Sequence, residues 1–278
     1  MADQSRDDDE LVPADFLALP ERPGKPRSRG VTHVIDTGLL PSTLESLLEG
    51  AGAHIDFVKF GWGTAYVSHQ IKAKVRACQA AKVRTCVGGT LLELAAVQGK
   101  VGEFLRWAGA VGFDAVEVSE GSIELGREVK RALIEAVSKD FCVLAEVGSK
   151  DPAAPVRAQT WVAQMRSDLE AGASFVVAEG RESGTVGLYG PDGSIREPLV
   201  QALVAGVPAD RLIFEAPDRA HHKWFVRHLG IEVNLGNVAP DDVIGIETLR
   251  RGLRADTAGL AVSALGILGI GRDSGGMC

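Results

Sequence analysis

The chain contains a series of short apolar runs, and most of them end in a side chain that could take part in catalysis or binding. These end residues are Asp36, Lys59, Glu117, Glu146, Glu179, Glu215 and Asn234. An acid buried without a partner is costly, so each carboxylate either pairs with a neighbouring Arg or Lys or belongs to a site. Pairing explains any one acid equally well, but the recurrence of acids at the run ends favours a functional cluster.

Several carboxylates around one cavity would supply the oxygen ligands that Mg²⁺ prefers. We therefore expect a Mg²⁺ site, and its candidate ligands are Glu117, Glu146, Glu179 and Glu215. Zinc is not expected, because the histidines avoid the run ends and no His or Cys spacing resembles a zinc site.

Basic side chains and glycine turns accompany these acids. Lys59 ends one run, Lys150 follows another, and Arg181 lies in the glycine-containing segment 179–184. A plain loop explains each glycine turn taken alone, but cations and close backbone amides together favour a small phosphorylated or carboxylated substrate. The residues expected to hold it are Arg181, Ser183, Gly184, Gly88, Gly89 and Asn234. A serine hydrolase is not supported, because the chain has no G-x-S-x-G sequence.

The apolar runs recur about every 28 residues, and the segments between them have helical periodicity, as in Val129, Leu133 and Val137. Apolar strands that alternate with helices are typical of a parallel sheet covered on both faces. Eight such units predict an α/β fold, a TIM-type (β/α)₈ barrel, in which the strand ends meet at one mouth. A doubly wound sheet is the alternative, but no G-x-G-x-x-G follows the first run.

Length and composition indicate how the chain is divided and which classes of partner are not expected. We expect an extended, proline-containing arm over residues 1–30, one barrel over 31–270 and a flexible glycine-rich tail over 271–278. A formal net charge of −7 without basic runs argues against nucleic acid as a partner. No apolar stretch reaches membrane-spanning length and no secretory leader is visible. The four cysteines resemble reduced thiols, so a cytoplasmic location is expected.

Eight segments of the sequence resemble signatures of the phosphosulfolactate synthase family, in the family's order, from about residue 15 to residue 257. They are 56–64, 88–93, 116–119, 146–148, 179–184, 213–217, 233–235 and 247–254. The resemblance implies a homo-oligomeric barrel and a Mg²⁺-dependent addition of sulfite to phosphoenolpyruvate, which is a carbon–sulfur lyase activity. It implies Lys150 as the proton donor and Arg181 as the phosphate ligand. The expected catalytic residues are Lys150, Lys59 and Asp36.

The chain departs from the family pattern at three positions. Thr37 and Ser149 stand where the family usually has lysine, and Val87 stands where it commonly has proline. Two fewer cations would hold a doubly charged nucleophile less well. The departures leave two alternatives open: a changed nucleophile or acceptor, or a catalytically silent barrel that serves as a binding or scaffold protein. The retained charged residues at the run ends favour an enzyme.

Overall fold

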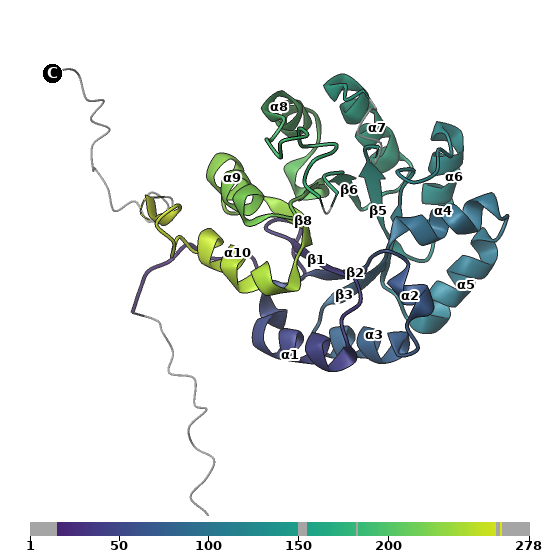
Figure 1. Ribbon diagram of the computed structural model, residues 1–278, viewed down its shortest axis with the longest axis horizontal. Helices are drawn as coiled ribbons and strands as arrows, with labels where there is room; N and C mark the ends of the chain where they lie inside the picture. The colour runs from purple at the N-terminus through teal and green to yellow at the C-terminus, as the bar shows by residue number, and fades with distance from the viewer. Residues whose placement is uncertain (1–15, 150–154, 182, 260–261, 263–278) are drawn as a thin grey trace, which may run out of the picture.

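The chain folds into a closed barrel of eight parallel strands in sequential order, surrounded by helices (Figure 1). The computed structural model describes residues 16–149, 155–181, 183–259 and 262. The predicted TIM-type (β/α)₈ fold is confirmed. Residues 1–15 of the expected arm, Lys150 and the expected tail over 271–278 lie outside the described residues.

Each strand pairs in parallel with the next, and β1 pairs with β8 to close the barrel. The strands are β1 (Thr32–Asp36), β2 (Phe57–Phe60), β3 (Arg84–Val87), β4 (Ala115–Val118), β5 (Cys142–Val147), β6 (Phe175–Ala178), β7 (Leu212–Glu215) and β8 (Asn234–Val238).

The helices form the outer ring visible around the strands in Figure 1. They are α1 (Pro41–Ala51), α2 (Thr64–Val67), α3 (Ile71–Ala80), α4 (Gly89–Val97), α5 (Val101–Val111), α6 (Arg127–Val137), α7 (Ala158–Glu170), α8 (Glu197–Gly206), α9 (Arg219–Leu229) and α10 (Val243–Arg250). The longer helices bury apolar side chains against the strands, as α6 does with Leu133, Ile134 and Val137, whereas the short α2 buries only Ala65. Of the helices in the described ranges, none is long and apolar enough to cross a membrane.

Alternation along the strands divides the core into two parts. In β2, Val58 and Phe60 pack outward with the helices, whereas Phe57 belongs to the core inside the barrel. The inner core is the apolar set Val31, Phe57, Cys86, Ala115, Leu144, Phe175, Val177 and Ile213. Lys59 lies two residues beyond Phe57 and therefore projects inward at the carboxyl end of the barrel.

Asn234 is not at the mouth, contrary to the sequence prediction, because it begins β8 instead of ending it. Its Oδ1 accepts the N–H of Val31 at 2.9 Å, and its Nδ2 donates to the carbonyls of Ser28 and Leu212 at 3.1 Å. These partners lie at the amino ends of the strands. Asn234 therefore helps to close the opposite face of the barrel.

The described part of the arm lies along that same face. Arg27 pairs with Asp56 at 3.2 Å, just before β2, and Arg22 pairs with Glu247 of α10 at 3.1 Å. Both pairs are largely buried, so the segment from Arg22 to Arg27 is attached to the barrel at its amino end, away from the strand ends that carry the acids.

Candidate active site

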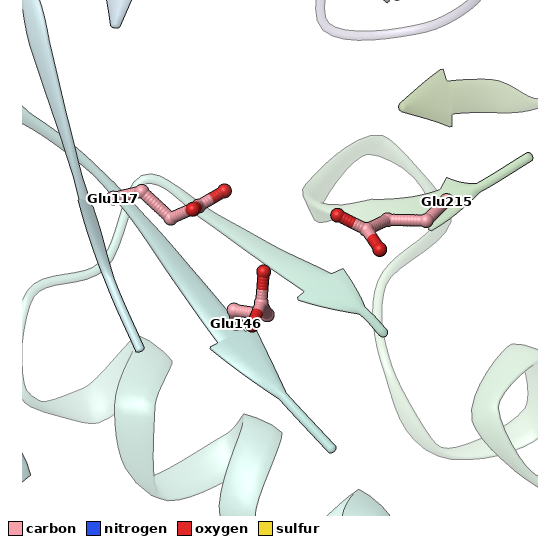
Figure 2. Close-up of side chains that lie close together, drawn as sticks. All are labelled: Glu117, Glu146 and Glu215. Carbon is pink, nitrogen blue, oxygen red and sulfur yellow. The ribbon is translucent and has the colours of Figure 1, made fainter. Parts of the chain in front are cut away.

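Three glutamates meet inside the carboxyl end of the barrel. Glu117 from β4, Glu146 from β5 and Glu215 from β7 are buried, and each offers a carboxylate oxygen within 4.8 Å of the others. Figure 2 shows the three side chains converging from separate strands. The sequence-based expectation that these acids gather at one mouth is met by the geometry.

Lys59 of β2 completes this cluster. Its Nζ donates to Glu117 Oε2 at 2.8 Å and to Glu215 Oε1 at 3.2 Å, and the side chain is almost fully buried. Burial alone would lower the pKa of the ammonium, but the charges of Glu117, Glu215 and Glu146 outweigh it, and the pKa lies well above its ordinary value. In the metal-free protein, the three glutamates therefore favour the charged form of Lys59 over its neutral amine.

The glycine turns hold the protein's own carboxylates. Gly89 N–H donates to Glu117 Oε1 at 3.0 Å, and the N–H groups of Gly180 and Arg181 donate to Glu215 Oε2 at 3.0 and 3.1 Å. A side chain on Gly180 would collide with Tyr189 and with the carbonyl of Glu215. These amides were expected to cradle a substrate anion, but in the protein they orient the acids instead.

Glu179, one residue beyond β6, lies at the edge of the cluster. Its Oε1 accepts the N–H of Arg181 at 2.6 Å. It lines the same small cavity, of about 50 Å³, as Lys59 and the three clustered glutamates. Glu179 is not among the acids whose oxygens lie within 4.8 Å of one another.

The cavity contains some of the predicted anion-binding residues and lacks others. Arg181, Gly88 and Gly89 line it. Ser183 and Gly184 do not, since the Ser183 hydroxyl faces Thr185 at 2.9 Å and Gly184 packs beside His221.

Asp36 does not join the cluster although it ends β1. It is fully buried, it pairs with Lys74 of α3, and its Oδ1 accepts the N–H groups of Gly38 and Leu39, each at 2.8 Å. Its side chain lies between strand and helix, so Asp36 orders the turn after β1. A direct catalytic role for Asp36 is not compatible with this position.

Sequence reasoning missed Asn237, Trp62 and Thr90, which also line the cavity. The available signal for Asn237 was a second asparagine in the same apolar run, three residues after Asn234. Trp62 and Thr90 lie inside segments 56–64 and 88–93, which carry the family resemblance, and follow two of the predicted strands.

A larger cavity of about 920 Å³ lies beside this one, between the loops that follow β4, β5 and β6. Arg127, Arg157 and Arg196 line it, and each stands at the start of a helix, where a cation is disfavoured by the helix dipole. Ser149, one of the departures from the family pattern, lines it as well. Glu120 and Glu124 line this cavity too, so its described lining has one more basic side chain than acidic, whereas acids outnumber basic side chains around the small cavity.

The model of the (2R)-phospho-3-sulfolactate synthase (ComA) family matches residues 20–256. A phosphosulfolactate synthase from Methanothermobacter thermautotrophicus is 43% identical over 251 residues, which cover 88% of this chain and 97% of that protein. The chain belongs to the phosphosulfolactate synthase family. Family enzymes from Methanocaldococcus jannaschii and Bacillus subtilis are 42% and 38% identical, over 83% and 87% of this chain and 94% and 97% of theirs.

Solved structures outside the phosphosulfolactate synthase family share the barrel alone. The YdjI aldolase from Escherichia coli K12 aligns with a TM-score of 0.52 at 13% identity, over 87% of this chain and 92% of that chain. A dihydrodipicolinate synthase family protein from Coccidioides immitis aligns with a TM-score of 0.53 at 12% identity, over 88% and 77%. At such identities the likeness concerns the fold and says nothing about chemistry.

Proposed function

We propose that this enzyme catalyses the Mg²⁺-dependent addition of sulfite to phosphoenolpyruvate to form phosphosulfolactate. Family membership supports the reaction class. The observation that carries the proposal for this chain is the buried cluster of Lys59 with Glu117, Glu146 and Glu215 at the mouth of the barrel. A barrel retained only as a scaffold would gain nothing from burying four charges.

The donor set of the cluster fits a divalent metal ion. Three carboxylates opposed by one ammonium leave a formal excess of two negative charges in a buried place, which is costly without a further cation. Carboxylate oxygens are the ligands that Mg²⁺ prefers. Glu117, Glu146 and Glu215 would hold the ion, which would supply positive charge to a substrate carboxylate on which negative charge develops.

The other roles in the reaction, which are positioning, anion binding and proton donation, belong to side chains of the protein. In the addition, sulfite sulfur forms a bond to the methylene carbon, the double-bond electrons move toward the carboxylate, and a proton returns to the adjacent carbon. Lys59 keeps Glu117 and Glu215 in place through its two ion pairs. Arg181, whose main-chain N–H is held by Glu179 and Glu215, offers its guanidinium to a substrate anion. Lys150 is the proposed proton donor, on the strength of the family resemblance.

The second candidate is a related addition with a different nucleophile. Ser149 supports it, because it lines the large cavity at a position where the family usually has lysine. Thr37, the other departure, is exposed after β1. Both candidates use the same acceptor and the same metal cluster, so only the attacking anion differs.

Product formation tests the proposal directly. The protein is incubated with phosphoenolpyruvate, Mg²⁺ and sulfite, and phosphosulfolactate is detected by phosphorus NMR and mass spectrometry. We expect product in this mixture, and none with Glu117→Gln/Glu215→Gln or with sulfate in place of sulfite. Absence of product from a protein that still binds phosphoenolpyruvate would exclude sulfite and favour the second candidate.

A further inference from the structure

Among the described residues other than glycine, left-handed backbone is concentrated at the mouth. Within the described ranges, four residues other than glycine have positive φ: Trp62 (54°), Lys82 (55°), Arg181 (55°) and Asn237 (51°). Three of them, Trp62, Arg181 and Asn237, line the same small cavity above the glutamate cluster. Side chains seldom occupy this region, and such conformations gather at binding sites because the surrounding fold holds them there.

Asn237 has a buried amide oxygen that no described group satisfies. The side chain is 6% exposed, yet its Oδ1 accepts no hydrogen bond from any described residue. Asn234, three residues earlier on β8, differs sharply, because both ends of its amide are bound to main-chain groups. A buried amide normally finds partners, so Asn237 is held open toward the cavity that it lines.

Trp62 stands at the outer edge of the same cavity. Its side chain is 64% exposed, and its left-handed backbone places it in the turn between β2 and α2. A large indole left this exposed contributes little to the core, whereas at a cavity edge it can cover a flat ligand and exclude water from it.

We propose that Asn237 and Trp62 are substrate-recognition residues, in which the Asn237 amide donates to an anionic oxygen of the substrate and the Trp62 ring covers its planar face. The two ends of an amide have the same shape, and turning the group over exchanges its oxygen and its NH₂ group, so Asn237 can offer a donor to an anion in the cavity that it lines. The choice of a planar acid rests on the proposed function. The recognition role itself requires only a small oxyanion in this cavity.

Binding of phosphoenolpyruvate in the presence of Mg²⁺, measured by calorimetry, tests the proposal. Asn237→Gly removes the amide, and Asn237→Asp keeps its shape but replaces the donor with a negative charge. We expect both variants to weaken binding by roughly tenfold or more, the aspartate variant the more strongly. Trp62→Gly removes the ring and is expected to weaken binding roughly threefold to tenfold.

Lys82→Gly is the matched control, because Lys82 is the remaining left-handed residue and lies between α3 and β3, on the amino face of the barrel. All three glycine substitutions suit a left-handed backbone, so none is expected to lower the melting temperature. Lys82→Gly is expected to bind phosphoenolpyruvate like the wild-type protein. A drop in affinity confined to the Trp62 and Asn237 variants then reports on recognition and not on folding.

The outcomes separate the two proposals when inorganic phosphate, sulfite and pyruvate are tested alongside phosphoenolpyruvate. If the Asn237 variants bind phosphoenolpyruvate as well as the wild-type protein does, the recognition role is wrong and the proposed function stands. If the wild-type protein binds only another of these anions and Asn237→Gly loses it, the recognition role stands and the proposed function is wrong. If the wild-type protein binds none of these four anions, both the recognition role and the proposed function are wrong.

Discussion

Lys59 is a buried cation that contacts two of the three clustered glutamates. Its ammonium neutralises part of the charge of three glutamates that would otherwise repel one another. Without a metal ion, the same carboxylates raise the pKa of Lys59 and favour its charged form. Its contacts with Glu117 and Glu215 make it a positioning residue for two of the candidate metal ligands.

Replacing Lys59 with methionine should destabilise the metal-free protein by about 3–5 kcal/mol at neutral pH, because it leaves buried carboxylates without their cation. Urea unfolding of both proteins measures the difference. The folded-state pKa of Lys59 is raised, so its stabilising effect is complete below the ordinary value of 10.5 and is lost as pH rises through the folded-state pKa. Equal stability at pH 7 would contradict a net stabilising role.

A second prediction at the residue scale concerns Mg²⁺ binding by the glutamate cluster. Wild-type protein should bind Mg²⁺ in calorimetry, and Glu117→Gln/Glu215→Gln should bind it at least roughly tenfold more weakly, because two oxygen anions are lost. Glu135→Gln, an exposed change on α6, serves as the control. If the double variant binds Mg²⁺ with unchanged affinity, the ion is held elsewhere.

The sequence could predict which acids end strands but not which face each of them occupies. Asp36 and Glu215 both end a strand, yet Asp36 projects toward α3 and Glu215 projects into the barrel. One step along a strand reverses the direction of the side chain, and neither residue type reveals it. Lys74 in the following helix was the available clue that Asp36 has a structural partner.

At the scale of elements, helices α6 and α7 are both connected to strand β5, which carries Glu146. Lys130 of α6 donates to the main-chain carbonyl of Glu146 at 2.6 Å and to Asp168 Oδ2 of α7 at 2.8 Å. All three residues are buried. A single ammonium therefore joins two helices to the strand that carries a candidate metal ligand.

Lys130→Met should destabilise the protein by about 3–5 kcal/mol, because Asp168 is left as an unpaired buried acid. Lys130→Met/Asp168→Asn should be more stable than Lys130→Met, since no buried charge then remains without a partner. Urea unfolding compares the variants. A double variant no more stable than Lys130→Met would show that the link to Glu146, and not the ion pair, is the main contribution.

Strand order and strand number were predictable because apolar runs alternate with helical periodicity. The boundaries of β8 were not. The expected run had its end residue at Asn234, but the strand starts there, passes through Gly236 and ends at Val238. A side chain on Gly236 would approach Ile213 and His33 inside the barrel, so this glycine reflects close packing within a strand and not a turn. Because of this error, Asn234 was expected at the mouth, whereas Asn237 is the asparagine that lines the cavity.

At the scale of the whole molecule, an acidic protein must attract an anionic substrate. The formal net charge is −7, yet three arginines (Arg127, Arg157 and Arg196) line the large cavity beside the glutamate cluster, where they outnumber Glu120 and Glu124. Such a local positive field can raise the rate of encounter with an anion despite the overall charge. The family resemblance was visible in the sequence, whereas this grouping was not, because the three arginines follow three different strands.

Arg127→Gln/Arg157→Gln should lower kcat/KM for phosphoenolpyruvate by roughly tenfold at low ionic strength, and the difference should shrink as salt is added. Initial rates at several salt concentrations measure it. Arg131→Gln, an exposed change on α6 where Arg131 pairs with Glu135, should leave the rates unchanged. A loss that is independent of salt would indicate direct contact with the substrate instead of long-range attraction.

The closure of the barrel between β1 and β8 has a consequence for how the chain folds. Every other strand pairing joins consecutive units, whereas this one joins the two ends of the barrel. Arg250 of α10 bridges it by donating to the carbonyl of Val233 and to that of Val31, 219 positions away. Since closing a long loop costs entropy before its contacts form, the seven local pairings can assemble first as an open sheet. In that order of assembly, Phe57 and the other side chains of the inner core would face water until the seam closes, so we expect closure of the seam to be the step that buries them.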